Sequence, residues 1–580
     1  MANIRYIAKP NLEIDGKQAP DDLMEDILQI SVEESLHLPG MFTLVIQNAY
    51  APGREKDKVW KHKDLFAIGK PIKIGFGSST TEAFEFEEEK EGNVLEGEIT
   101  AMETHFTSGS QAPIIIRGYD VSHRLHRGRY NRSFQNMTDS DIIKKIAGEV
   151  GIPAGTVDGS GTPHEYVFQE NQTNMEFFRE RAARIGFELF IQDGKLNFRK
   201  PKVDQSLELK WLKDLHSFRV RVSSAEQVSE VEVRGWDYTR KQPIVERATK
   251  EKVLTSTKNG KGSKTSNSFK GKPPTPKMMV VDQPLFSSDE AKKMAQSLCD
   301  ELGGEFVLAD AKGEGNPKIR PGRVIKLNEL ADYSGEYYVT ETRHFYHDRV
   351  YHTDFSVRGL RGGNLFTVLS PKTRLQPGQT CLAGIVTNNK DPKRWGRVKV
   401  KFPTLTEEHE SNWARVVAIG AGPGRGFDCL PEVNDEVLVA FEHGDIHRPY
   451  VLGGVWNGKD APPEKVDNSV AGKVRLRTFK TRTGHQLQFV EEDKAASKDG
   501  VYIETAGGHK IRINDSDRFV EIQTAGGHQL TLNDRTRSIA MQSTGSIEIK
   551  AKTTVDIQGM SINIKASGVV TVNGALIKLN

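Results

Sequence analysis

Near the C-terminus three units open alike, with Thr483-Gly484-His485-Gln486-Leu487, Gly507-Gly508-His509-Lys510-Ile511 and Gly526-Gly527-His528-Gln529-Leu530. After them, apolar pairs recur at steps of 8, 7, 8 and 7 residues. The pairs are Ile547 with Ile549, Val555 with Ile557, Ile562 with Ile564, Val570 with Val572, and Ile577 with Leu579. Each unit fits one short strand with both apolar side chains on one face, followed by a polar turn. The periodicity therefore predicts a β-solenoid or β-helix.

These ten apolar residues are the predicted core of the C-terminal part. One short strand cannot bury its apolar face alone, so the face must be closed by successive coils of one chain or by partner chains. The residues alone leave both possibilities open. The run continues nearly to Asn580 without a bulky cap. We therefore expect its end to be capped by another protein or to be a working surface.

Five short β patterns precede this region, between about residues 380 and 460. Turn-forming residues such as Asp391-Pro392 and Asn434-Asp435 separate them. The predicted strands are residues 382–386, 397–402, 414–417, 436–441 and 449–453. Five strands in about 80 residues fit a small closed barrel of the OB type.

The first 375 residues mix strands with three capped helices. Thr138 and Asp141, and likewise Thr173 and Glu176, have the spacing of a capping box, and Ser287 begins a third helix. The predicted helices lie near residues 138–150, 173–185 and 287–302. Alternating apolar residues predict strands at 28–32 and 42–46 and a hairpin over 187–198. The predicted class is mainly β, with β-barrel-like domains and a few helices.

Composition narrows the function classes. The 580 residues are enough for about four domains, yet only 36% are hydrophobic and 53 are Gly, which favours solvated β structure. The net charge of +3 gives no overall attraction to nucleic acid. Cys299, Cys381 and Cys429 are few and far apart, so we expect no disulfide framework and a reducing compartment for assembly. No secretory leader and no membrane-spanning helix is expected.

Two clusters of chemistry-bearing residues are interpreted as structural. Residues 252–281 contain seven Lys and no acidic residue among Gly, Ser, Thr and Pro, which predicts a mobile loop or linker. His344, His347 and His352 lack the spacing of a helix-borne zinc site. If they lay on one strand, His344 and His352 would share a face and His347 would point the other way. We expect surface or hairpin histidines here, no metal site and no cofactor.

Residues 384–458 resemble the OB domain of VgrG proteins, the spikes of type VI secretion systems and related contractile injection machines. The resemblance rests on ordered motifs: Gly384-Ile385-Val386, Gly396-Arg397-Val398-Lys399-Val400-Lys401-Phe402-Pro403, Phe441-Glu442-His443-Gly444-Asp445 and Trp456-Asn457-Gly458. Residues 173–198 and 335–355 are similar to the hub half of the same family, which is shared with phage tail hubs. The repeated C-terminus is similar to its needle.

The resemblance implies a homotrimer with a hub (1–375), an OB domain (376–465) and a triple-stranded β-helix needle (466–580). The hub ring would match a hexameric inner tube and contact baseplate proteins. The needle would cross the target membrane transiently, with a PAAR-like tip protein or effector on its end. The implied tip-binding residues are Ala575, Leu576, Ile577, Lys578, Leu579 and Asn580. The spike would assemble in the cytoplasm at the baseplate end of an injection particle, then cross the target envelope or be released extracellularly.

A non-enzymatic spike is the preferred hypothesis. Only about 15–25 residues separate Trp456-Asn457-Gly458 from the first repeat, too few for the lysozyme domain of phage relatives. Asn580 ends the needle, so no fused effector is expected. The chain has no G-x-S-x-G, HExxH, P-loop or Rossmann motif. The alternatives are a cell-wall-degrading tail enzyme and a nucleic-acid-binding OB protein, which would use Arg397, Lys399, Lys401 and Phe402.

Overall fold

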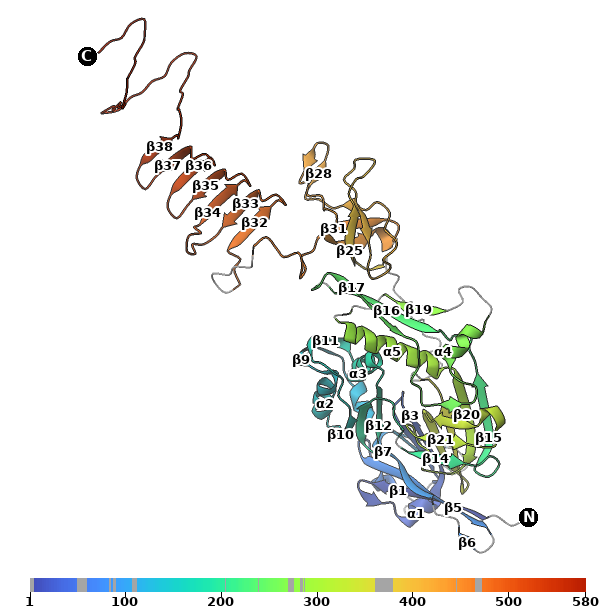
Figure 1. Cartoon of the computed structure of the whole chain (residues 1–580). Coiled ribbons are helices and arrows are strands. Elements are labelled where there is room, and N and C mark those ends of the chain that lie inside the picture. Colours follow the sequence, from blue (N-terminus) through green and yellow to red (C-terminus); the bar gives the residue numbers. More distant parts are fainter. Residues whose placement is uncertain are drawn as a thin grey trace. The chain divides into compact units, whose positions relative to one another are not determined.

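Strands dominate the chain and helices are few (Figure 1). The computed structural model describes residues 5–49, 60–82, 85–86, 90–106, 112–203, 205–237, 239–269, 276–281, 285, 287–359, 379–444, 446–464 and 472–579. Contacts divide the chain into two units, residues 1–459 and 460–580. The predicted mainly β class is confirmed. Within the described ranges, no helix is long and apolar enough to cross a membrane.

The largest sheet joins the N-terminal strands to strands from much later in the chain. Alternate residues of Met41–Ile46 are buried, as expected of strands with one inner face. Val32 pairs with His344 across the sheet, so the two parts share one core. The sheet order is β15 (Leu215–Val222), β20 (Val307–Glu314), β24 (Val350–Val357), β23 (Glu341–His347), β3 (Ile27–Ser35), β4 (Met41–Ile46), β8 (Ile114–Asp120), β7 (Lys90–Thr104), β5 (Pro71–Glu82), β1 (Arg5–Ile14) and β2 (Lys17–Gln18), with β6 (Glu85–Phe86) on β5.

Three longer helices begin where the capping residues predict. α2 (Asp139–Glu149) follows Thr138, whose hydroxyl accepts the amide of Asp141 at 3.2 Å. α3 (Asn174–Ile185) has the second capping box and ends at Gly186, whose φ of 70° is left-handed. α5 (Ser288–Gly304) follows Ser287 and packs against β16 (Glu230–Asp237) and β17 (Gln242–Ala248). The apolar faces of α2 and α3 enter one buried cluster.

The remaining elements of residues 1–375 are short. The small sheets are β9 (Tyr130–Met137) with β11 (His164–Gln172); β10 (Ala154–Val157), β13 (Lys195–Arg199) and β12 (Glu188–Gln192); β14 (Ser206–Leu209), β21 (Val324–Leu327), β22 (Gly335–Tyr338) and β18 (Ser256–Thr257); and β17, β16 and β19 (Lys277–Val280). The short helices are α1 (Asp21–Asp26), η1 (Lys63–Leu65), η2 (Val121–His126), α4 (Gly262–Thr265), η3 (Ser266–Ser268) and η4 (Ala331–Tyr333).

The Lys-rich stretch is more regular than the predicted loop or linker. β18 pairs with β22, and α4 and η3 follow it directly. Lys261 donates from Nζ to the carbonyl of Glu251 at 3.0 Å, and Glu251 accepts the amide of Ser263 at 3.2 Å. Residues 270–275 of this stretch lie outside the described residues. Its described part is therefore anchored to neighbouring elements.

A buried arginine ties three distant segments together. Arg320 is 3% exposed and donates from Nε and Nη2 to the carboxylate of Glu34 on β3. Its Nη1 donates to Asp193, in the turn between β12 and β13, at 2.7 Å. The same guanidinium donates to the carbonyls of Asn93 and Val94 on β7, both at 3.1 Å. All three guanidinium nitrogens thus donate hydrogen bonds, which uses the planar arrangement of donors that only arginine provides.

The three histidines lie on a hairpin, as one of the two predicted settings has it, but the structure corrects their assignment to faces. A tight turn at Asp348 and Arg349 separates β23 from β24, so the histidines do not lie on one strand. His347 and His352 share a face, where their rings lie near Phe345. His344 is on the other face, fully buried rather than on the surface. It hydrogen bonds to Tyr351 at 2.7 Å and to the carbonyl of Ile319 at 3.1 Å.

His344 predicts a loss of stability in acid. Burial, together with the charge of Arg320, lowers the pKa of His344 to about 3. The unfolded chain, with a His pKa of about 6.5, therefore binds more protons between these values, and stability falls as the pH drops through this window. Between pH 6.5 and pH 5, the free energy of unfolding of the wild-type chain should fall by about 2 kcal/mol more than that of H344Q. Urea unfolding at both pH values checks this; equal losses would contradict it.

Residues 382–454 form the predicted OB-type barrel. The sheet order is β26 (Lys399–Lys401), β25 (Leu382–Asn388), β30 (Glu436–Phe441), β31 (Pro449–Gly454) and β27 (Arg415–Val416). A bridge between Val398 and Ala414 brings the two edges together. A hairpin of β28 (Ala421–Gly422) and β29 (Arg425–Gly426) projects from it, and η6 (Glu442–Gly444) precedes β31. Trp236 of β16 donates from Nε1 to Glu436 at 2.6 Å, linking the barrel to the preceding sheets.

Candidate functional site

The second unit contains one seven-stranded antiparallel sheet in which the strands follow in chain order (Figure 1). Its strands are β32 (Leu476–Lys480), β33 (Gln486–Val490), β34 (Gly500–Glu504), β35 (Lys510–Asn514), β36 (Phe519–Gln523), β37 (Gln529–Asn533) and β38 (Ser538–Gln542). Each strand is five residues long and pairs only with its neighbours in sequence. The sheet is thus a meander, not a stack of solenoid coils within one chain.

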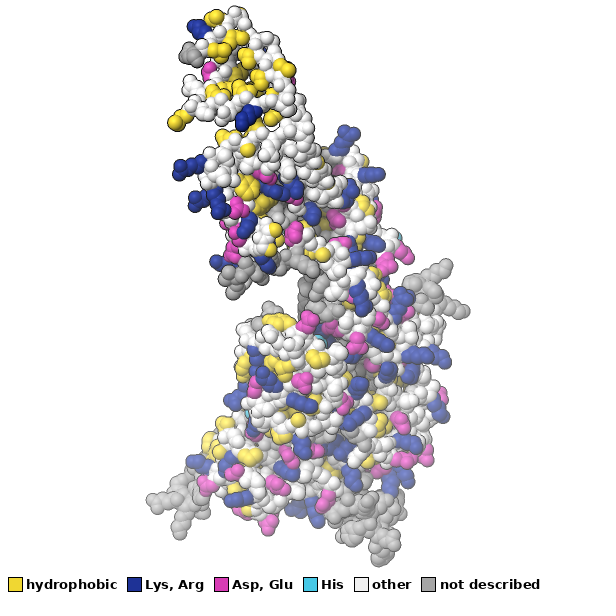
Figure 2. Space-filling model, turned by 60° about the vertical axis from the view of Figure 1, so that its left-hand side comes forward, with side chains coloured by type: hydrophobic (Ala, Val, Ile, Leu, Met, Phe, Trp, Pro, Cys, Tyr) yellow, Lys and Arg dark blue, Asp and Glu magenta, His cyan; other side chains and the backbone are white. Residues whose placement is uncertain are grey.

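Two apolar rows run across one face of this sheet. Cross-strand pairing aligns the members of each row, and the two rows are two residues apart along each strand. The rows are Phe479, Leu487, Ile503, Ile511, Ile522, Leu530 and Met541, and beside them Phe489, Val501, Ile513, Val520, Leu532 and Ile539. Ten of these thirteen side chains are exposed. Hydrophobic side chains gather at the C-terminal end of the chain in Figure 2.

The other face of the sheet is mostly polar. Between the apolar positions lie Thr478, Gln488, Tyr502, Arg512, Glu521, Thr531 and Ala540. Arg512 lies 3.5 Å from Glu521 across the strands. The unit therefore has one face suited to water and one face suited to burial, as sequence periodicity indicates.

The ten predicted core residues of the last forty positions are exposed in the single chain rather than buried. No strand is assigned within the described residues 543–579. The ten side chains are between 48 and 91% exposed, because one chain provides no cover for them. Their role as a needle core stays a prediction, since it needs partner chains. The residues are Ile547, Ile549, Val555, Ile557, Ile562, Ile564, Val570, Val572, Ile577 and Leu579.

Residues 543–579, which follow β38, are called the extension. The predicted tip residues lie at its end. Ala575, Leu576, Ile577, Lys578 and Leu579 are all exposed. Asn580 lies outside the described residues. The surface is accessible, and its binding role stays a prediction.

In the barrel, cationic side chains lie over aromatic rings in the segments that precede β26 and β27. Lys393 and Arg397 lie over the ring of Trp395 at 4.7 and 5.0 Å. Arg397 also lies over Trp413, at 5.6 Å. Two hydrogen bonds from Arg397 hold the pKa of Asp391 well below its usual range. The cations occupy the ring faces on which a nucleobase would otherwise stack.

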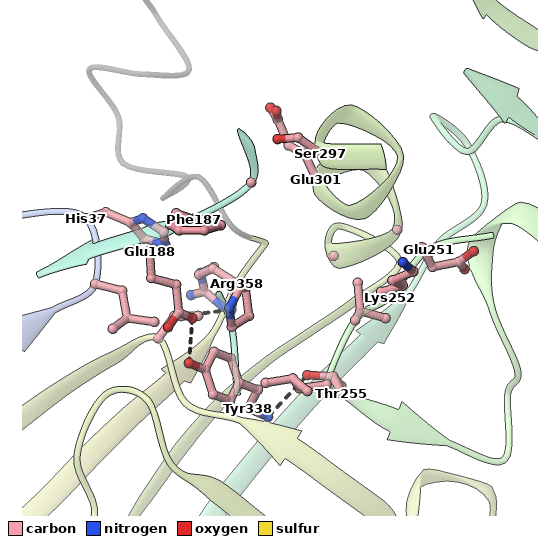
Figure 3. A pocket seen from close by; sticks show the side chains of 18 of the residues that line it. His37, Phe187, Glu188, Glu251, Lys252, Thr255, Ser297, Glu301, Tyr338 and Arg358 are labelled. Carbon is pink, nitrogen blue, oxygen red and sulfur yellow. Dashed lines mark hydrogen bonds between the residues drawn. The ribbon is translucent and has the colours of Figure 1, made fainter. Parts of the chain in front are cut away.

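The first unit contains a cavity of about 880 Å³ that no sequence motif indicated (Figure 3). His37, Phe187, Tyr338 and Arg358 line it from segments far apart in the chain. Tyr338 donates to Glu188 at 2.5 Å, and burial raises the pKa of Tyr338 well above its ordinary value. Burial lowers the pKa of His37 to about 4, so its ring is neutral at physiological pH. Tyr338 and Glu188 thus bond to each other, and His37 is neutral.

The described residues contain no group of three metal-ligating side chains. Asp139, Arg181 and the half-buried His164 form a polar cluster, with Arg181 Nε 2.5 Å from Asp139. Asp139 is 1% exposed and lies at the start of α2. The cluster joins α2, α3 and β11, so its position indicates a packing role.

Two family models match this chain. The Alg8 N-terminal domain matches residues 6–348, more than half of the chain. The type VI secretion system/phage-baseplate injector OB domain matches residues 382–456, which contain the barrel. The first match contains the three longer helices and most strands of the large sheet.

VgrG proteins are among the known relatives of this chain. The type VI secretion system spike protein VgrG3 of Vibrio cholerae is 24% identical over 418 residues, which cover 65% of this chain and 38% of VgrG3. The actin cross-linking toxin VgrG1 of Vibrio cholerae is 31% identical over 112 residues, 19% of this chain and 10% of that protein. The aligned part thus spans well under two thirds of these relatives.

A solved structure similar to part of this chain is the 43 kDa tail protein of prophage MuSo2 from Shewanella oneidensis. It has a TM-score of 0.45 and 16% identity, and covers 61% of this chain and 98% of the tail protein. Because the family model matches residues 6–348, the chain belongs to the Alg8 N-terminal domain family, and its OB domain and relatives make it similar to VgrG spike proteins.

Proposed function

We propose that this chain is a non-enzymatic homotrimeric spike at the tip of a contractile injection system. The hub (1–375) caps the hexameric inner tube and contacts baseplate proteins, and the OB domain (376–465) forms the neck. The needle (466–580) pierces the target membrane. Residues 575–580 carry a PAAR-like tip protein or an effector.

The observation that carries this proposal is the exposed apolar face of the second unit. An apolar surface that runs over seven strands and continues through residue 579 is too extensive to stay in water. A five-residue strand offers only two inward side chains, about 7 Å apart, which suits a narrow prism. Three sheets with these faces inward bury both rows. The described residues 543–579 form no hydrogen-bonded strand pairs within one chain. In three intertwined chains, neighbouring copies supply these backbone hydrogen bonds.

A structural role is also supported by the way polar groups are used in the first unit. Buried groups such as Arg320, Glu34 and Asp139 bond to one another or to partners on distant segments. The cation-covered rings of Trp395 and Trp413 disfavour the nucleic-acid alternative. The proposed spike assembles in the cytoplasm at the baseplate end. It then crosses the target envelope or is released with the particle.

The experiment is a copy count in purified injection particles from cells that produce the chain. Quantitative mass spectrometry with labelled peptides compares the chain with the tube protein as tube length varies. The proposal expects three copies per particle whatever the tube length, and a tag on the chain at one end only in electron micrographs. A copy number that rises with tube length, or a chain absent from particles, would overturn it.

A further inference from the structure

Three nearly identical turns stack along one edge of the seven-stranded sheet. They are residues 481–485, 505–509 and 524–528, and they join β32 to β33, β34 to β35 and β36 to β37. In each, the Thr amide donates to the His carbonyl at 2.8–3.0 Å, and the Thr hydroxyl accepts the His amide at 3.1–3.2 Å. The Gly before each His has a φ between 85 and 99°. These bonds hold every His backbone in the same position.

The rings of these histidines are held as well. The amide of Ala506 donates to Nδ1 of His485, and the amide of Ala525 donates to Nδ1 of His509, both at 3.3 Å. Nδ1 of His528 lies 2.9 Å from the hydroxyl of Ser543. A neutral ring whose Nδ1 accepts carries its proton on Nε2. The exposed His485 and His509 therefore present Nε2–H donors, repeating every second strand, about 9.6 Å.

Turns that contain acidic residues stack along the opposite edge, and the turn between β37 and β38 also carries Arg535 and Arg537. Residues 514–518 join β35 to β36, and residues 533–537 join β37 to β38. In both, the Asn side chain accepts an amide three residues later, from Asp517 at 2.7 Å and from Thr536 at 2.9 Å. Asp515 and Asp534 follow these Asn residues and are exposed. A longer acidic turn, residues 491–499, precedes them on the same edge.

Threefold symmetry decides which edges meet. If three copies place their apolar faces inward around an axis along the strand order, the ends of the strands form the corners of the prism. Rotation carries each edge onto the same edge of the next copy, so the histidine edge of one chain meets the acidic edge of its neighbour. The histidine turns and the turns of the opposite edge each recur at every second strand, and the two sets are offset by one strand along the axis. Turns of neighbouring chains can therefore interleave.

We propose that each corner of the trimer is a seam in which the histidine turns of one chain pack against the acidic turns of the next, at residues 491–499 and 514–518. His509 and His528 flank Asp515 of the neighbouring chain and supply ring donors to its carboxylate. This inference rests on the proposed trimer. The apolar rows change little along the axis and would tolerate a slip of two strands. The seams oppose such a slip. The turn at 491–499 is longer than the other turns on its edge, so it can pack against the neighbouring chain at only one position along the axis.

Engineered cysteines test the seam. In a background with the exposed Cys381 and Cys429 replaced by Ser, H509C and D515C are combined in the full chain. Within one chain, the two positions flank β35 and are about 20 Å apart, too far for a disulfide. Any bond between them must therefore join two chains. Oxidation should convert most of the protein to a covalent trimer on a non-reducing gel.

The matched control combines H509C with H528C, both on the histidine edge. These cysteines face no cysteine of a neighbour, so no covalent trimer should form, and each single variant should likewise stay uncrosslinked. The pair H528C/D515C should crosslink like the first and provides a second test of the same seam if the first variant folds poorly.

The mass of each reduced variant, measured by light scattering, distinguishes failure of the proposed seam from failure of the proposed trimer. A trimer by light scattering that forms no disulfide with either cross-edge pair would overturn the seam and leave the spike intact. A reduced chain that is monomeric would overturn the trimer, and the seam with it. Covalent trimers from the same-edge control would also contradict the proposed arrangement.

Discussion

I549D is expected to abolish the trimer at nanomolar concentration. Ile549 belongs to the first apolar pair of the extension and is 64% exposed in the single chain. In the proposed needle, threefold symmetry brings three copies of this side chain together at one level. Three carboxylates placed there would each lose hydration without a partner, at a cost of several kcal/mol per ion. Light scattering should find single chains.

The neighbouring residue provides the control. Lys550 alternates with Ile549 and so points away from the needle axis, and K550D should leave the trimer intact. I549V should also stay trimeric, since this smaller change costs about 0.5–1.5 kcal/mol per chain. Equal behaviour of I549D and K550D would show that the apolar pairs do not form the core.

R320M is expected to destabilise the first unit by about 3–5 kcal/mol. The substitution leaves Glu34, which is 8% exposed, as a buried carboxylate without its cation. It also removes the links from β3 to β7 and to the turn at Asp193. Urea unfolding of the full chain, followed by tryptophan fluorescence, measures the change.

Two variants separate the buried charge from other effects. R117M removes an exposed pair with Glu103 in the same large sheet and should cost less than about 1 kcal/mol. E34L/R320M removes both buried charges and should recover much of the loss, because an apolar pair of similar size replaces the ion pair. A loss in R320M no greater than in R117M would contradict a locking role for Arg320.

Local patterns in the sequence predicted the helices and the barrel well. Thr138, Thr173 and Ser287 fix helix starts through bonds only three residues long, so no tertiary information was needed. The alternation of apolar residues in 382–441 likewise reports which side of each strand is buried. The hairpin at Asp193-Gly194 could also be predicted locally, because these residue types favour the positive φ that the turn requires and that both residues adopt.

Features that depend on distant contacts could not be predicted. Nothing near Arg320 in the sequence indicates that Glu34 and Asp193 complete its site. The turn at Asp348-Arg349 lacks Gly, Pro and Asn, so the histidines were placed on one strand and their faces were misassigned. The repeat near the C-terminus fits a meander as well as a solenoid, because both need one apolar pair per strand.

The most direct test of the spike account is the solution mass of the purified full chain, measured by light scattering and followed on dilution to nanomolar concentration. The account predicts a stable species close to three times 64.7 kDa, which deletion of residues 470–580 weakens. A species of 64.7 kDa would contradict it, because the apolar rows would then lack the partner chains that the account requires.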